Sequence, residues 1–148
     1  MGLQQQVMEQ MKAAMKAKDT VALESLRAIK SALLLAQTSG SGNDLSEDDE
    51  IKLVQKLVKQ RKDSAAIYEK QGRADLAAPE LAQAAIIEQF LPEQLSEEEI
   101  EKVVVRTIND TGASGMKDMG KVMGMVSKEL AGQADGKTIS SIVRSKLA

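Results

Sequence analysis

The chain has 148 residues, a net charge of −2 and 43% hydrophobic residues, which is enough apolar material for one ordinary domain or two small ones. Aromatic residues make up only 1%, and a composition rich in Ala, Leu, Met, Lys, Glu and Gln favours helix. No segment approaches the roughly 20 apolar residues of a membrane-spanning helix, and no secretory signal or disulfide framework is apparent. We therefore expect a cytoplasmic protein with no membrane partner.

The absence of histidine and cysteine restricts the chemistry that the chain can perform. It removes the commonest general base, the thiol nucleophile and the usual zinc ligands. Neither a nucleophile elbow nor a nucleotide-binding glycine loop is present. We assign no catalytic residue, no metal ligand and no cofactor, and we expect a protein that binds a partner rather than one that catalyses a reaction alone.

The first 91 residues carry apolar positions at helical spacing in four stretches, which predicts four helices. The first helix is expected over 4–17, and the second follows Asp19, whose carboxylate can cap it. Ser46 is expected to open the third helix, after a loop over 38–43 that is rich in Gly and Ser.

The fourth helix is expected to begin near Asp75. Pro79 lacks an amide hydrogen, so we expect it in the first turn of this helix, where the loss costs little. Leu91-Pro92 follows and is the best candidate for a domain boundary. It divides a helical N-terminal domain, 1–91, from a tail, 92–148.

The tail pattern predicts three more helices. Ser96 begins a capping box for the first of them, glycines within 112–115 end it, and a methionine-rich helix follows. Asp135 is expected to cap the last helix. No segment alternates with period two, so we predict an all-α fold with a four-helix N-terminal domain and a small three-helix tail domain.

Arg61 lies on the apolar stripe of the third helix, three residues after Val58 and four before Ala65. An arginine on such a stripe needs a carboxylate, and Asp75 or Asp63 would supply it. A structural ion pair and an anion-binding site are both consistent with this position.

Positive charge is concentrated in the tail. From Lys102 onward the sequence has eight basic and four acidic residues, a local net charge of +4 in an acidic chain. This excess is either a solvated helix surface or a weak phosphate-binding face.

Gly120 and Gly124 each cost a helix roughly 1 kcal/mol relative to Ala, so we expect another backbone to approach closely there. The methionines of this region either fill the core or dock a partner, and Met125 lies off the apolar stripe.

Five motifs occur in order along nearly the whole chain. They are Lys59-Gln60-Arg61-Lys62-Asp63-Ser64, Gly72-Arg73-Ala74-Asp75-Leu76, Leu91-Pro92-Glu93-Gln94-Leu95-Ser96, Met119-Gly120-Lys121-Val122-Met123 and Gly132-Gln133-Ala134-Asp135-Gly136-Lys137. Together they resemble the YqeY family. Pro79 departs from this resemblance, because a charged residue is usual at that position.

The tail of that family is similar to the C-terminal tail of the B subunit of the tRNA-dependent glutamyl/aspartyl amidotransferase, where it helps to hold the tRNA. The resemblance implies an accessory or tRNA-binding protein, whose partners are tRNA and an amidotransferase or synthetase protein. The family label, carbon–nitrogen ligase with glutamine as amido-N-donor, implies an alternative in which the chain acts within a complex that supplies the active site. A protein-interaction module that uses the methionine-rich helix is a third hypothesis.

The resemblance and the local charge together define the expected contacts to tRNA. These residues are Lys117, Gly120, Lys121, Gly124, Gly132, Gly136, Lys137 and Arg144. Four other residues are assigned structural roles: Arg61, Asp75, Ser96 and Asp135.

Overall fold

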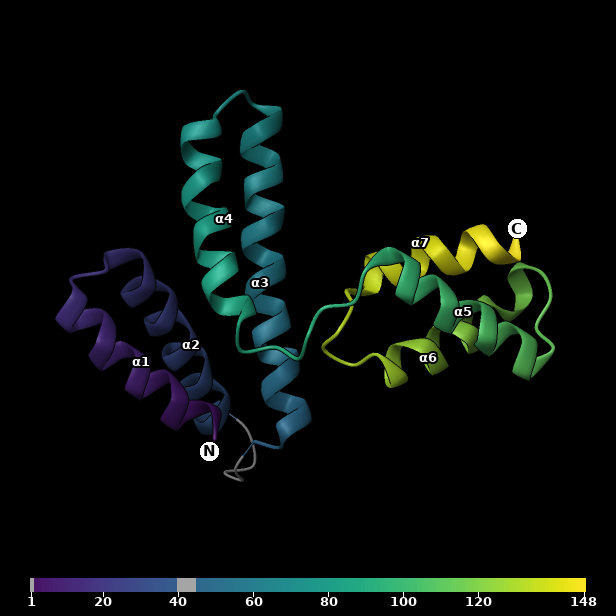
Figure 1. The fold of residues 1–148 in the computed structure, drawn as a ribbon, viewed down its shortest axis with the longest axis horizontal. Helices are drawn as coiled ribbons and strands as arrows, with labels where there is room; N and C mark the ends of the chain where they lie inside the picture. The colour runs from purple at the N-terminus through teal and green to yellow at the C-terminus, as the bar shows by residue number, and fades with distance from the viewer. Residues whose placement is uncertain (1, 40–44) are drawn as a thin grey trace. The chain divides into compact units, whose positions relative to one another are not determined.

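Seven α-helices and one short 3₁₀ helix make up the described part of the chain, residues 2–39 and 45–148 of a computed structural model (Figure 1). These residues form no strand, so the all-α prediction is confirmed. The helices are grouped in two units, Met1–Leu91 and Pro92–Ala148, which are divided in the sequence at the Leu91-Pro92 step.

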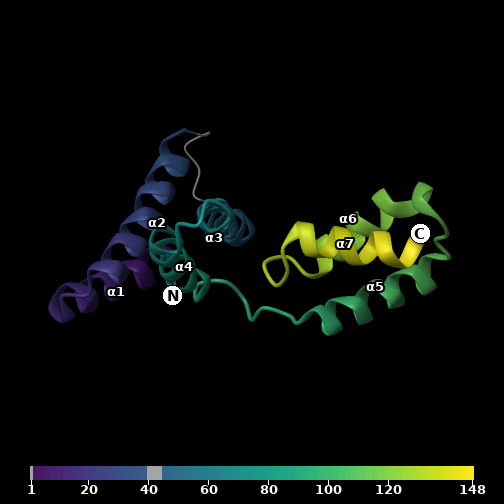
Figure 2. The same ribbon diagram turned by 90° about the horizontal axis from the view of Figure 1, so that it is seen from above.

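The first unit contains α1 (Leu3–Ala17), α2 (Thr20–Ser39), α3 (Glu47–Lys70) and α4 (Ala74–Glu88). Helix α1 packs along α2 and α3 packs along α4, while α2 also contacts both α3 and α4 (Figures 1 and 2). The apolar stripes read from the sequence face inward. The most deeply buried side chains of this core are Val7, Leu26, Ile29, Val54 and Ile87.

Ser46 opens α3 through a complete capping box. Its hydroxyl oxygen accepts the Asp49 amide at 3.1 Å, and the Asp49 carboxylate accepts the Ser46 amide at 3.3 Å. The expected loop over 38–43 lies outside the described residues from position 40 onward. Thr38 belongs to α2, where its hydroxyl donates to the Leu34 carbonyl at 2.9 Å, so this helix is longer than predicted.

The expected position of Pro79 in a first turn was wrong. Helix α4 begins at Ala74, which makes Pro79 its sixth residue and leaves the carbonyl of Asp75 without its helical donor. Asp75 is exposed, so water can reach that carbonyl. Ala77 and Ala84, at 2% and 1% exposure, are buried on either side of the proline. The tertiary packing therefore outweighs the local preference.

Arg61 joins three helices through a neutral amide instead of an ion pair. Its Nε donates to Oε1 of Gln83 at 3.1 Å, and its Nη1 donates to the Leu57 carbonyl at 3.1 Å. The amide nitrogen of Gln83 in turn donates to the Glu24 carboxylate at 3.3 Å. The guanidinium of α3 is thus connected to α2 by way of α4.

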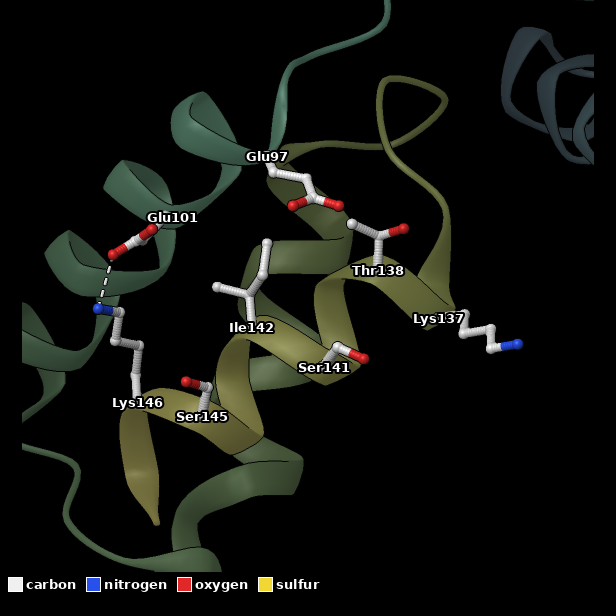
Figure 3. Close-up of a pocket in the computed structure, with 8 residues that line it drawn as sticks. All are labelled: Glu97, Glu101, Lys137, Thr138, Ser141, Ile142, Ser145 and Lys146. Carbon is white, nitrogen blue, oxygen red and sulfur yellow. Dashed lines mark ion pairs between the residues drawn. The ribbon is translucent and has the colours of Figure 1, made fainter.

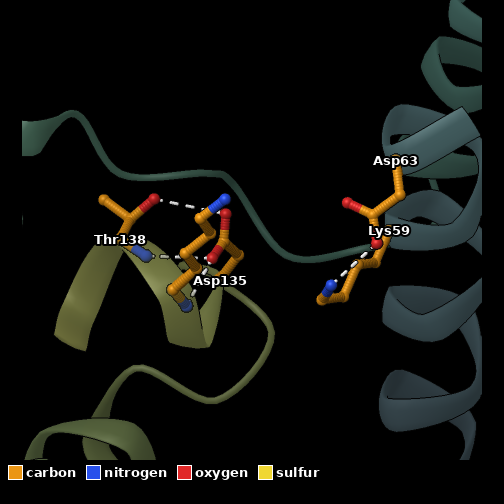
Figure 4. A network of polar contacts seen from close by, with 5 residues as sticks. Lys59, Asp63, Asp135 and Thr138 are labelled. Carbon is orange, nitrogen blue, oxygen red and sulfur yellow. Dashed lines mark hydrogen bonds and ion pairs between the residues drawn. The ribbon is translucent and has the colours of Figure 1, made fainter. Parts of the chain in front are cut away.

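The two carboxylates expected to pair with Arg61 are engaged elsewhere, so that prediction was wrong. Asp75 accepts two hydrogen bonds from Arg73, each at 3.0 Å, and this contact lowers the pKa of the Asp75 carboxyl group. Asp63 pairs with Lys59 at 2.8 Å (Figure 4). Asp63 lies four residues after Lys59 on the same face of α3, whereas Arg61, two residues before it, lies on another face. Asp75 lies two residues after Arg73 and pairs with it at the start of α4.

We expect Arg61→Ala to lower the free energy of unfolding by about 1–2 kcal/mol, because two hydrogen bonds from a charged donor are lost. The loss should be smaller than for a buried ion pair, since no buried carboxylate is stranded. Urea unfolding would measure it, with Arg73→Ala as the matched control, since that guanidinium serves only an exposed pair. Equal stability of the two variants would contradict this account of Arg61.

The second unit contains α5 (Glu97–Thr111), the 3₁₀ helix η1 (Met116–Asp118), α6 (Met119–Glu129) and α7 (Gly136–Leu147). Each of the three α-helices contacts the other two. Their shared core consists of aliphatic side chains: Ile100, Val104, Val122, Val126, Leu130, Ile139, Val143 and Leu147.

Ser96 caps α5 in a form that differs slightly from the expected box. Its hydroxyl oxygen accepts the Glu99 amide at 3.2 Å, which satisfies one free donor of the first turn. The Glu99 carboxylate lies 3.2 Å from the same hydroxyl, so it accepts from the hydroxyl group.

Candidate nucleic-acid interface

The exposed side of α6 carries lysines separated by glycines. Lys121, Gly124 and Lys128 follow one another at intervals of three and four residues, which places them on one face of the helix. Gly120 borders this face, and Lys117 lies in η1 directly before it. All five residues are exposed, and Val122 and Val126 on the opposite side are fully buried. We call these five residues the α6 face.

The lysines of the α6 face carry charge that nothing in the described part of the chain neutralises. Elsewhere in the second unit, Arg106 pairs with Glu129 and Lys146 pairs with Glu101 at 2.6 Å. None of the α6-face lysines takes part in an ion pair with a described residue. The local positive charge expected from the sequence is therefore available on this face.

Gly120 and Gly124 are not required by packing within the chain. A Cβ atom built on either residue would meet no atom within 4 Å. Both glycines lie in regular helix, where Ala would be the more stable choice by roughly 1 kcal/mol. Their effect on the structure is to leave the helix backbone uncovered between the lysines.

A second basic row lies on α7. Lys137, Ser141 and Arg144 are exposed and follow one another at intervals of four and three residues. Lys137 also borders a cavity of about 340 Å³ between α5 and α7, together with Glu97 and Glu101. Figure 3 shows the Lys137 side chain directed away from the two carboxylates, while the ion pair between Glu101 and Lys146 lies at the other end of the cavity. The basic residues among the predicted contacts therefore fall into two rows, one along η1 and α6 and one on α7.

Asp135 has the capping role predicted for it at the start of α7. Its Oδ1 accepts the amides of Lys137 and Thr138 at 2.7 and 3.0 Å, and its Oδ2 accepts the Thr138 hydroxyl at 3.2 Å (Figure 4). Gly136, the first residue of α7, is exposed beside this cap. The carboxylate is thus fully used in the local structure.

Gly132 differs from the other predicted contact glycines because it is buried in the turn between α6 and α7. Its φ of +80° is a conformation that glycine adopts without strain. Its carbonyl accepts a hydrogen bond from the side-chain Nε2 of Gln94 at 2.6 Å. The conformation of the turn is sufficient to explain why glycine occupies this position.

The methionines of the second unit form two pairs that differ in burial. Met119 and Met123 are partly buried and pack against the core. Met116 and Met125 are 47% and 45% exposed. Core filling therefore holds for Met119 and Met123, and partner docking by Met125 stays a prediction.

Lys128 belongs to the α6 face, but it was not among the contacts to tRNA expected from the sequence. The signal was present, because Lys128 lies seven residues, two helical turns, after Lys121.

Within the described residues, no group of three or more carboxylates is placed to hold a metal ion, and no helix is long and apolar enough to cross a membrane.

Comparison with known proteins places these observations in a family. The sequence model described as Yqey-like protein matches residues 4–147. The E subunit of the glutamyl-tRNA(Gln) amidotransferase of Thermococcus gammatolerans is 35% identical over 104 residues, which is 68% of this chain but only 17% of the length of that relative.

Two yeast proteins, each named altered inheritance of mitochondria protein 41, are also similar. The protein of Kluyveromyces lactis is 30% identical over 134 residues, covering 88% of this chain and 68% of its own length. The protein of Meyerozyma guilliermondii is 34% identical over 121 residues, covering 80% and 63%. Both are named as mitochondrial, so these relatives give no support to the expected cytoplasmic location. With a family match that spans nearly all of its length, the chain belongs to the YqeY family.

Proposed function

We propose that this protein binds tRNA through the α6 face, as an accessory to a tRNA amidotransferase or synthetase. The observation that carries the proposal is the row of unpaired Lys117, Lys121 and Lys128 over a helix backbone left open by glycine. Lysine ammonium groups bind phosphates as point charges, and uncovered backbone allows a nucleic-acid strand to approach closely.

The relationship to a component of an amidotransferase supports tRNA as the nucleic acid. That relative is named for an enzyme of glutamyl-tRNA(Gln), and the match covers only a small part of it. We infer that the shared segment contributes binding and that the chemistry belongs to other parts of such enzymes. Carbon–nitrogen ligase activity would then require a complex that supplies the active site, and we expect the isolated chain not to release ammonia from glutamine.

The proposal predicts weak tRNA binding that depends strongly on salt. The chain has a net charge of −2, so attraction must come from a few local contacts and not from the field of the whole protein. Three phosphate contacts would give a slope of about −3 when log affinity is plotted against log salt concentration. Fluorescence anisotropy of labelled tRNA, titrated with purified protein at several salt concentrations, measures this slope.

Two results would contradict the proposal in different ways. Binding that salt does not weaken would exclude the lysine–phosphate contacts on which it rests. An absence of affinity at the lowest salt concentration would remove tRNA binding itself, and the exposed Met116 and Met125 would then favour a protein-interaction module. Met125→Asp would then disrupt a protein complex, whereas Lys121→Glu with Lys137→Glu would leave that complex intact.

A further inference from the structure

We propose that the RNA element on the α6 face is a base-paired stem, held through its sugar–phosphate backbone without recognition of base sequence. The inference rests on the proposed function and adds which part of an RNA the site accepts. It follows from which side chains the second unit has and from where its arginines are engaged.

The α6 face has no platform on which an unpaired base could stack. Residues 92–148 contain no Phe, Tyr, Trp or His, and the two aromatic residues of the chain, Tyr68 and Phe90, belong to the first unit. Single-stranded RNA is bound mainly by stacking of its bases on aromatic rings or arginine planes. Arg106 is held by Glu129, and Arg144 projects from α7, so neither guanidinium belongs to the α6 face.

The α6 face also lacks the side chains that read base edges. Bidentate recognition of bases uses Arg, Asn or Gln, whose donors and acceptors have fixed geometry. Apart from its lysines and glycines, this side of α6 offers only the short hydroxyl group of the exposed Ser127. A lysine is a flexible point charge, which suits phosphates along a backbone and gives little discrimination between bases.

The dimensions of the face suit a paired stem. With a rise of about 1.5 Å per residue, Lys121 and Lys128 are about 10 Å apart along the helix axis. An A-form stem presents two phosphate strands beside a wide, shallow minor groove. A helix whose exposed side lacks side chains at Gly120 and Gly124 can lie close to such a surface while its lysines contact the phosphates.

The test measures the affinity of the purified 148-residue chain for three fluorescent RNAs of equal length at low salt. Two are fully paired hairpins with unrelated stem sequences, and the third has a sequence that cannot pair. We expect the two hairpins to bind with equal affinity and the unpaired RNA to bind on the order of tenfold more weakly, since duplex has the higher charge density and no base is stacked. Lys121→Gln with Lys128→Gln should lower hairpin affinity, and Lys102→Gln, an exposed lysine on α5, should not.

The outcomes separate this inference from the proposed function. Tighter binding of the unpaired RNA, or a clear preference for one stem sequence, would overturn the paired-stem inference while leaving RNA binding intact. Failure of all three RNAs and of tRNA to bind would overturn the proposed function itself. Equal loss of affinity in the Lys102 control would overturn the assignment of the stem to the α6 face.

Discussion

Replacing Lys117, Lys121 and Lys128 together by glutamine is expected to weaken tRNA binding on the order of 100-fold at low salt, and to flatten its salt dependence. The three side chains supply the exposed, unpaired charge of the α6 face. Glutamine keeps the helix propensity of lysine, so the helix content should not change. Anisotropy titrations and circular dichroism measure the two effects separately.

Two matched variants show whether position or total charge is responsible. Lys102→Gln removes an exposed charge from α5 and should leave the affinity nearly unchanged. Lys137→Gln with Arg144→Gln removes the α7 row and should have an intermediate effect, since these residues extend the basic surface on a second helix. The variants differ in the number of charges removed, so affinity losses are compared per charge. If each removed charge, including that of Lys102, lowers the logarithm of the affinity equally, binding would be nonspecific attraction and the α6 face would have no special role.

The largest loss of stability is expected from Ile87→Ala, which should lower the free energy of unfolding by about 2–5 kcal/mol. Ile87 is 0% exposed in the core of the first unit, so its removal leaves a cavity that the surrounding helices cannot easily close. Leu81→Ala, on the same helix but 43% exposed, is the matched control and should change stability by at most about 0.5 kcal/mol.

Tyr68 provides a convenient signal for this comparison. It is the only tyrosine of the chain and lies in α3, within the same unit as Ile87. Its fluorescence during urea unfolding therefore follows the first unit. Similar midpoints for the Ile87 and Leu81 variants would show that the core depends less on Ile87 than its burial indicates.

The helices could be predicted from the sequence because their signals are local. Ser46, Ser96 and Asp135 each cap the helix that follows, through hydrogen bonds to amides two or three residues away. The apolar spacing of each stretch then fixes which side is buried.

Contacts between residues on different helices could not be predicted from the sequence in the same way. Arg61 was expected to find a carboxylate, but its contacts with Gln83 depend on how α3 and α4 align. Pro79 is the sixth residue of α4, whose position depends on its packing against α3 and not on the local preference of proline. In the candidate site, the charge excess indicated the region, and the seven-residue spacing of Lys121 and Lys128 already indicated a shared helix face. Only the structure showed that Gly132 is buried in a turn.

The segment before α5 is already part of the second unit. Leu95 donates its amide to the Gln133 carbonyl at 2.9 Å, Gln94 donates to the Gly132 carbonyl, and the Gln133 side chain donates to the Glu93 carbonyl at 3.5 Å. A fragment cut at Ser96 would keep all three helices but lose every one of these bonds, leaving the turn before α7 without its support. Anyone who wishes to study the second unit in isolation should therefore begin the fragment at Pro92.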